Sequence, residues 1–273
     1  MGSVMSLWSD RSFLRDVQYH TDANLAARQS IYAYQQPPVD LTGQMLDAVL
    51  PAGAGRVGVV ADVGCGNGLF LAELARRGYG RRLIGADLSP GMLRSARQRT
   101  RQAGLAGPAL VAADVSALPL RDSSADLTLA MHMLYHVPEP EVALGELRRV
   151  TRPGGRLVVG LNGTDHHREL RALIRAGLAD LGHHAVAMVG ERFGLDEGEV
   201  LLRRLFPSVV RYEFRGRLVI PGREPVATYV RSLSLASRLG DPETLVRAVV
   251  SRLPSDPGAT FLDTTDSGCL VCT

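Results

Sequence analysis

The stretch VVADVGCGNGLFL, residues 59–71, contains the strongest structural signal in this chain. Its apolar run leads to three glycines, Gly64, Gly66 and Gly68. An amphipathic segment follows directly, at residues 69–77. Strand, glycine turn and helix in this order open a nucleotide-binding α/β unit, because only glycine lets the backbone approach a ligand so closely. The spacing is G-x-G-x-G, since Leu69 stands where a dinucleotide-binding G-x-G-x-x-G motif has its last glycine.

Acidic residues end the first three predicted strands. Asp62 stands two residues before the first glycine, Asp87 ends the second strand and Asp114 ends the third. A carboxylate after the second strand can bind both hydroxyls of a ribose, and one after the third can accept from an exocyclic amine of a base. An acidic end of the first strand suits a cationic ligand better than a pyrophosphate. Each carboxylate alone is equally consistent with a helix cap, but the series of three favours a nucleoside site.

Strands and helices alternate from residue 57 onward, which predicts a parallel sheet with helices on both faces. We expect strands at residues 57–63, 82–87, 109–113, 126–132 and 155–161, with helices at 69–77, 90–103 and 139–150. After Asn162 the alternation loosens. There the pattern predicts helices at 166–181, 195–205, 225–239 and 242–253, and strands at 209–220 and 259–273. Two further helices are expected before the first strand, at 22–34 and 41–50.

Composition limits the classes of protein that this chain can represent. Its 273 residues suit one large α/β domain with a modest appendage. All 31 basic residues are arginine and they are scattered, which indicates codon use in a GC-rich genome and predicts no nucleic-acid partner. The three cysteines cannot form a disulfide framework, so we expect a cytoplasmic protein. No apolar run is long enough to cross a membrane, so no membrane partner is expected.

Four motifs follow one another in a characteristic order: VVADVGCGNG, IGADLSPGMLRSAR, AADVSALPLRDSSADLTLAMHMLYHV and ELRRVTRPGGRLVV. Over residues 57–162 the chain resembles the class I S-adenosylmethionine-dependent methyltransferases, in particular the methyltransferase type 11, ubiquinone-type small-molecule group. The resemblance implies a Rossmann-like α/β fold, with a seven-stranded, mostly parallel sheet of order 3-2-1-4-5-7-6 whose last strand is antiparallel. We expect effectively one domain. Residues 1–50 would form an N-terminal helical lid and residues 51–273 the methyltransferase domain, with substrate-side insertions within 163–254.

The same resemblance implies that the cofactor is S-adenosyl-L-methionine and the product S-adenosyl-L-homocysteine. It places Asp62 and the three glycines at the methionine end, Asp87 at the ribose, and Asp114 at the adenine. The complete predicted cofactor set is Tyr34, Asp62, Gly64, Gly66, Gly68, Asp87, Leu88, Met92, Asp114, Val115 and Met131. Tyr34 comes from the N-terminal region. Tyr19 and Arg28 in the same region are also candidates for contact with the cofactor or the substrate.

Three histidines are the candidate catalytic residues: His132, His136 and His167. His132 and His136 lie just past the fourth strand, near the place where the methyl group should emerge. His136 belongs to an L-x-H-V pattern that favours a structural role, so His132 is the stronger candidate for a substrate-side group. His167 follows the fifth strand and, with its neighbours, is open as a base or a metal ligand. No separated carboxylates join it, so we expect no metal.

The predicted function is methyl transfer to a small-molecule acceptor through oxygen, nitrogen or carbon, in bacterial specialised-metabolite biosynthesis, by a monomer or homodimer. A general base helps a hydroxyl or ammonium acceptor and is dispensable for a free amine. One alternative is a non-catalytic S-adenosylmethionine-binding regulatory protein. A second is an RNA methyltransferase, but the N/D-P-P-Y/F motif of exocyclic-amine methylation is replaced by the sequence AMHM at residues 130–133. An NAD-dependent oxidoreductase is disfavoured by Leu69 and by the lack of lysine.

Overall fold

The structure is a computed structural model that describes residues 9–50, 58–104, 107–184, 186, 188, 191, 193–256 and 258–273. The start of the strand predicted at residues 57–63 and the first eight residues of the predicted lid lie outside the described residues.

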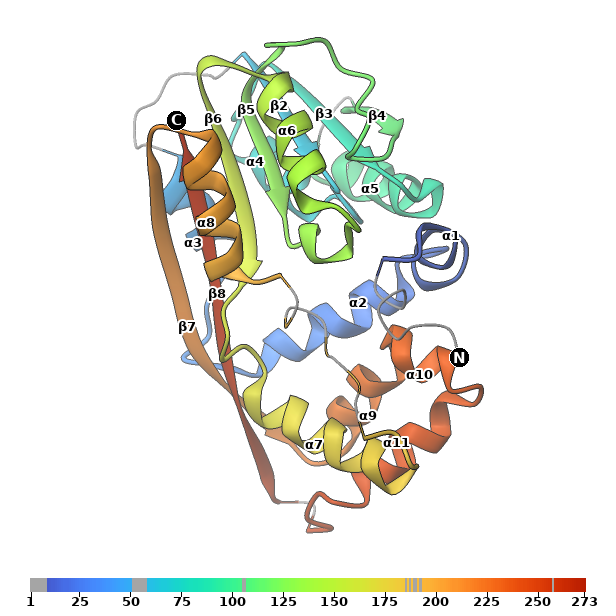
Figure 1. Ribbon diagram of the computed structural model, residues 1–273. Coiled ribbons are helices and arrows are strands. Elements are labelled where there is room, and N and C mark those ends of the chain that lie inside the picture. Colours follow the sequence, from blue (N-terminus) through green and yellow to red (C-terminus); the bar gives the residue numbers. More distant parts are fainter. Residues whose placement is uncertain are drawn as a thin grey trace.

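One mixed sheet forms the centre of the described chain (Figure 1), in the order β1-β7-β8-β6-β5-β2-β3-β4. Its strands are β1 (Gln35–Gln36), β2 (Val59–Val63), β3 (Arg82–Asp87), β4 (Ala109–Ala112), β5 (Ala125–Met131), β6 (Thr151–Asn162), β7 (Val209–Pro221) and β8 (Thr260–Cys272). Strands β2 to β6 pair in parallel, whereas β8 is antiparallel to both of its neighbours. This confirms the predicted order of seven strands. The two-residue β1 was not predicted and adds an eighth strand by pairing with Leu218 and Arg217 of β7.

Helices cover both faces of the sheet and form a separate group at one end (Figure 1). The α-helices are α1 (Arg11–Phe13), α2 (Ala23–Ser30), α3 (Leu41–Val49), α4 (Leu69–Arg76), α5 (Pro90–Gln102), α6 (Pro140–Val150), α7 (Arg168–Asp180), α8 (Leu195–Leu205), α9 (Glu224–Arg231), α10 (Ser234–Arg238) and α11 (Pro242–Val250). Short π and 3₁₀ segments occur at Leu14–Gln18, Ile31–Tyr34 and Leu134–His136. Local chemistry explains where α5 begins: the Ser89 hydroxyl caps the helix by accepting from the Met92 amide at 3.2 Å, and Pro90 occupies the first turn.

The helix predicted at residues 225–239 is instead two helices, α9 and α10, because the chain leaves helical geometry at Leu233. Leu233 has extended backbone angles and precedes α10. The break is stabilised from outside, since the Ser232 carbonyl accepts from the side chains of Gln18 at 3.0 Å and Arg28 at 2.7 Å. These partners come from more than 200 residues earlier in the chain, so the local sequence pattern could not reveal the break.

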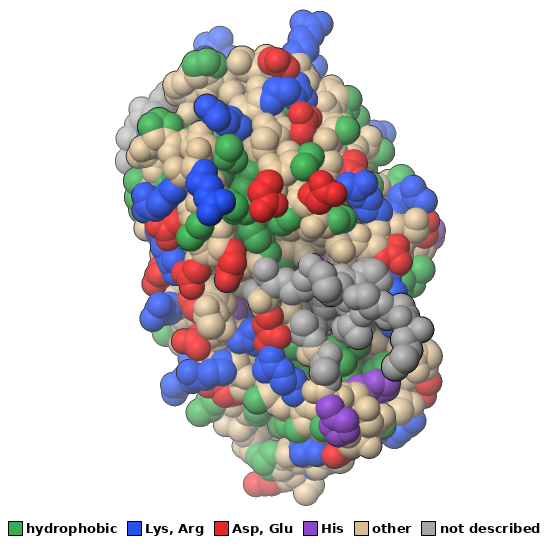
Figure 2. Space-filling view, viewed as in Figure 1, with side chains coloured by type: hydrophobic (Ala, Val, Ile, Leu, Met, Phe, Trp, Pro, Cys, Tyr) green, Lys and Arg blue, Asp and Glu red, His purple; other side chains and the backbone are tan. Residues whose placement is uncertain are grey.

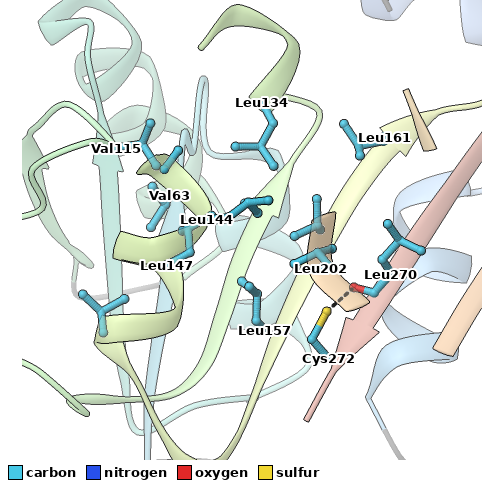
Figure 3. Close-up of a cluster of buried hydrophobic side chains, with 14 of the residues drawn as sticks. Val63, Val115, Leu134, Leu144, Leu147, Leu157, Leu161, Leu202, Leu270 and Cys272 are labelled. Carbon is cyan, nitrogen blue, oxygen red and sulfur yellow. Dashed lines mark hydrogen bonds between the residues drawn. The ribbon is translucent and has the colours of Figure 1, made fainter. Parts of the chain in front are cut away.

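Three clusters of buried apolar side chains hold these layers together. One lies between the sheet and helices α6 and α8 (Figure 3), where Leu144, Leu202 and Leu270 are fully buried. A second lies on the opposite face under α3 and α4. The third joins helices α7, α9, α10 and α11 to the far ends of β7 and β8, which run beyond the rest of the sheet (Figure 1). The helical end is therefore built around its own core.

The surface carries both signs of charge. On the face drawn in Figure 2, blue arginine and red carboxylate side chains intermingle, and the described residues there form no contiguous basic patch. Within the described ranges, every helix is too short or too polar to cross a membrane.

Candidate active site

A cavity of about 750 Å³ lies at the carboxyl ends of the central strands, between the sheet and the helical end. The parts of the chain that line it include the strand ends from β2 to β6, the N-terminal segment (residues 11–34), the starts of α3 and α5, and α7 with α9. Open α/β sheets bind ligands at this edge. All of the predicted site residues line the cavity except Tyr34 and Gly68. Tyr34 packs instead against the apolar cluster of the helical end.

The glycine turn has the backbone that its spacing predicted. Gly64, Gly66 and Gly68 all have positive φ, at 70°, 52° and 76°, where a side chain is strained. A Cβ at Gly64 would lie 2.6 Å from the Met133 side chain. A Cβ at Gly68 would lie 2.8 Å from the Cα of Ala96, so this glycine lets α4 approach α5 rather than lining the cavity.

Two neighbouring carboxylates form the most unusual electrostatic feature of the cavity. Asp62 is buried, and its Oδ2 atom has no hydrogen-bond partner among the described residues. Burial, with a smaller effect from the nearby Asp87 charge, raises the pKa of Asp62 to about 7. Asp87 accepts from the amides of Gly66 at 2.8 Å and Ser89 at 2.9 Å, which oppose the rise in its pKa caused by burial. An unpaired buried carboxylate oxygen is unfavourable unless a cation or donor meets it, so this pair fits a cationic ligand group.

The N-terminal segment is fastened over this part of the cavity by polar contacts. Arg11 pairs with Asp114 at 2.8 Å, while the other Asp114 oxygen accepts from the Ser116 amide. An adenine amine at Asp114 would therefore share this carboxylate with Arg11. Two more hydrogen bonds fix the segment: Ser89 Oγ donates to the Tyr19 carbonyl at 2.6 Å, and Asn67 Nδ2 donates to Gln29 Oε1 at 3.0 Å.

His132 and His136 have different surroundings although both follow β5. His132 has a φ of 54°, and its enclosure in the protein lowers its pKa to about 4, against a hydrogen bond with Asn162 that favours the proton. His132 is therefore uncharged at neutral pH and a weak base. His136 Nε2 lies 2.9 Å from the Tyr19 hydroxyl, which accepts from Arg28 at 3.0 Å. This hydroxyl joins His136 to the N-terminal segment.

His166 and Tyr32 begin a hydrogen-bonded chain at the other end of the cavity. Burial lowers the pKa of His166 well below its ordinary value, so the ring is neutral. Its Nδ1 accepts from the Asp266 amide at 3.1 Å. The single ring proton is therefore on Nε2, which lies 3.0 Å from the Tyr32 hydroxyl and donates to it.

His167 continues this chain. Its Nδ1 lies 2.5 Å from Oδ2 of the buried Asp263, whose other oxygen accepts from the Leu170 amide at 3.0 Å. Because the carboxylate accepts, the proton of a neutral His167 is on Nδ1. The Nε2 lone pair then faces the Tyr32 hydroxyl at 3.3 Å. The proton order is His166 to Tyr32 to His167, with Asp263 orienting the last ring as the third member of a catalytic triad does.

Asp263 was not among the predicted site residues, and Tyr32 lies within the helix predicted at residues 22–34. A signal for Asp263 was present: the predicted last strand reads TFLDTTDSGCLVC over residues 260–272, and polar residues in a strand covered on both faces demand buried partners. No described set of three or more His, Cys, Asp or Glu side chains is arranged as metal ligands.

Comparison with known proteins agrees with the fold and the glycine turn. The family model for the methyltransferase domain matches residues 61–159. These residues form a class I S-adenosylmethionine-dependent methyltransferase domain. Methyltransferase GfsG of Streptomyces halstedii is 41% identical over 101 residues, which cover 37% of this chain and 36% of GfsG. The matches span from about a third to just under half of the length of the first curated relatives.

Two solved structures share the fold of the methyltransferase domain and its surroundings. Phosphoethanolamine N-methyltransferase 2 of Haemonchus contortus has a TM-score of 0.58 at 14% identity, covering 97% of this chain and 59% of its own. The [4+2]-cyclase SpnF has a TM-score of 0.51 at 20% identity, covering 85% of this chain and 79% of its own. At these identities the similarity establishes the architecture alone.

Proposed function

We propose that this protein transfers the methyl group of S-adenosylmethionine to a small-molecule acceptor. The observation that carries the proposal is the unpaired, buried Asp62 carboxylate at the glycine turn of a methyltransferase domain, next to a cavity large enough for a second molecule. The Streptomyces origin of GfsG, together with basic residues that are all arginine, favours a specialised metabolite of a GC-rich bacterium as the acceptor.

The cofactor would supply an electrophilic methyl group on a sulfonium centre. In this proposal Asp62 meets the cationic methionine end, and Asp87 accepts from the ribose hydroxyls at the end of β3. The N-terminus of α4 favours the methionine carboxylate. Met92 and Val115, both buried, pack along the adenosine. The protein then contributes alignment and the exclusion of water, which are large effects in a displacement between two bound molecules.

His167 is the best-placed general base of the three predicted histidines. His132 has too low a pKa to hold a proton near neutrality, and His136 is engaged by Tyr19. His167 has a lone pair at Nε2, a carboxylate partner at Nδ1 and a hydroxyl relay in front of it. An acceptor proton can pass to the Tyr32 oxygen while the Tyr32 proton passes to His167, where Asp263 stabilises the resulting imidazolium. Such a base contributes roughly 10²- to 10⁴-fold.

The test measures S-adenosylhomocysteine formation and the mass of the acceptor product together, because SpnF is a cyclase with a similar fold. We expect a product heavier by one methylene group and stoichiometric S-adenosylhomocysteine. Binding of the cofactor with no methylated product across hydroxylated and amino acceptors would support the regulatory alternative instead. An RNA substrate would be revealed by RNA binding that weakens steeply as salt rises.

The base assignment is tested by His167→Gln and Asp263→Asn, with His132→Ala as the matched comparison. We expect the first two to lower turnover by roughly 10²-fold or more on a hydroxyl acceptor while cofactor affinity stays unchanged. The loss should shrink for the same acceptor with a more acidic hydroxyl, because less proton removal is needed. Equal loss in all acceptors, or a larger loss in His132→Ala, would refute His167 as the base.

A further inference from the structure

The cavity is divided by charge. Four carboxylates line it, all at strand-end turns or at the start of α3: Asp40, Asp62, Asp87 and Asp114. The other half, which we call the acceptor half, is lined by parts of α2, α7 and α9 with the loops beside them. No carboxylate of the described residues lines it, whereas Arg28 and Arg171 do. The other arginines that line the cavity, Arg11, Arg15 and Arg99, lie outside the acceptor half, and Arg11 pairs there with Asp114. The acidic half suits the cationic cofactor, so the acceptor half should suit a ligand of opposite sign.

Arg28 is the centre of this positive charge. It lies in the last turn of α2, and its guanidinium donates to the Tyr19 hydroxyl at 3.0 Å and to the Ser232 carbonyl at 2.7 Å. Both acceptors are neutral, and no described carboxylate forms an ion pair with it. By contrast, Arg149 and Arg211, which are also half-buried, have carboxylate partners: Glu146 at 2.7 Å and Glu199 at 3.1 Å.

Aromatic side chains surround this unneutralised guanidinium. Burial raises the pKa of Tyr229 to about 12, and the positive charge of Arg28 acts in the opposite direction on that hydroxyl. The same opposing effect of Arg28 is present at Tyr32 and Tyr135. A guanidinium has five N–H donors, so the two bonds that it makes leave others for a ligand. The Arg28 Cζ atom lies 5.4 Å from the centroid of the Tyr19 ring, which partly stabilises the cation. A partly buried cation with no counter-ion is stabilised further when an anion binds.

Arg171 adds to this charge from α7. It shares Glu191 with Arg175, so two guanidinium groups meet one carboxylate. Its Nε atom is buried and has no hydrogen-bond partner among the described residues. The acceptor half therefore contains more positive charge than the protein itself neutralises.

We propose that the acceptor is an amphipathic acid whose carboxylate pairs with Arg28. Its apolar or aromatic body would pack against Tyr229 and Leu233, and its nucleophilic group would face the Tyr32–His167 relay. A planar carboxylate matches the fork of a guanidinium and gains two parallel hydrogen bonds. This inference names the substrate class of the proposed methyl transfer and rests on that function for its biological meaning.

The methionine carboxylate of the cofactor is the competing partner for Arg28. The structure favours the acceptor because Arg28 is tied to Ser232 in the helical end, whereas the N-terminus of α4 faces the glycine turn. The competing assignment makes a different prediction for cofactor affinity, so one experiment separates the two.

The experiment is a calorimetric titration of the S-adenosylhomocysteine-saturated protein with benzoate, salicylate, 3-phenylpropionate and decanoate, and with the amide of each. We expect at least one acid to bind about tenfold or more tightly than its amide. In Arg28→Gln this preference should disappear, and in Arg28→Lys it should partly return. Arg231→Gln, which removes a positive charge from α9 outside the cavity, should keep the preference.

Two results would overturn the proposal. One is that no acid binds more tightly than its amide to the wild type. The other is that Arg28→Gln weakens S-adenosylhomocysteine binding as much as acid binding, which would assign Arg28 to the cofactor. Because the assay records binding without turnover, acid recognition with no methylated product would refute the methyl transfer and leave the anion site intact.

Discussion

Replacing Asp62 by Asn should stabilise the cofactor-free protein and at the same time weaken cofactor binding. The carboxylate is buried, one oxygen is unpaired among the described residues, and its pKa is raised from 3.8 to about 7. An acid whose pKa is higher in the folded state than in the unfolded state loses its proton more easily when the chain unfolds. The free energy of unfolding is therefore unaffected below the unfolded pKa and falls as the pH rises from the unfolded pKa to the folded pKa. A shift of about three pH units corresponds to about 4 kcal/mol once the pH exceeds 7. Relaxation and water entry reduce this, so we expect about 2–4 kcal/mol.

The assay is thermal unfolding of the cofactor-free wild type and Asp62→Asn at about pH 4, 5.5 and 8.5. The two should differ least in unfolding temperature near pH 4, because the folded Asp62 is then protonated and the unfolded carboxyl, with a pKa of 3.8, is only about half ionised. The unfolding temperature of the variant should rise relative to that of the wild type as the pH increases, and exceed it by roughly 5 °C or more at the highest pH. A variant that is less stable throughout, or whose advantage does not change with pH, would refute the reasoning. Calorimetry should show S-adenosylhomocysteine binding at least about tenfold weaker, since the cation has lost its partner.

Three further substitutions test neighbouring features. Asp87→Asn should destabilise the cofactor-free protein by about 1–3 kcal/mol, opposite in sign to Asp62→Asn, because it weakens two bonds from backbone amides; urea unfolding measures it, and a gain in stability would contradict it. Gly91→Ala should weaken S-adenosylhomocysteine binding several-fold by calorimetry, since the added Cβ would overlap the His20 carbonyl and push the N-terminal segment away; unchanged affinity would separate that segment from the cofactor site. Gly145→Ala in α6, where a Cβ meets open space, should raise stability by about 0.5–1 kcal/mol without affecting binding.

The half of the cavity that we propose for the cofactor was predictable because its geometry is encoded locally. Asp62, the glycine turn and the start of α4 are consecutive, so one stretch of sequence specifies strand, turn and helix together. Asp87 and Asp114 end strands whose parallel pairing brings their carboxyl ends to one edge. The sheet topology places the site as well, because a doubly wound sheet binds its ligand where the strand order reverses, at the carboxyl ends of the strands.

The acceptor half was not predictable in the same way, because its contacts join residues far apart in the chain. His167 and Asp263 are separated by 96 positions, and Tyr32 and His166 by 134. The periodicity of apolar residues along the sequence gives no information about such distant side-chain pairs. Even the backbone there follows distant partners: His167 adopts a φ of 54° at the start of α7, where its amide donates to the Thr264 carbonyl at 2.7 Å. A left-handed histidine costs about 1–2 kcal/mol, so the tertiary structure has to enforce it.

The long pair β7 and β8 explains how the distant residues meet. Each strand has 13 residues, and they pair along their full length, but β6 pairs with β8 only over residues 267–272. Residues 260–266 therefore extend past β6 together with the paired end of β7. Helix α7 packs on β8, α9 packs on β7, and α11 packs on these two helices around a separate apolar core. Asp263 lies on this extension, which sets it behind His167. Because the extension carries Asp263, which orients His167, while the glycine turn follows β2, changes in residues 260–266 should alter the acceptor reaction before they alter cofactor binding.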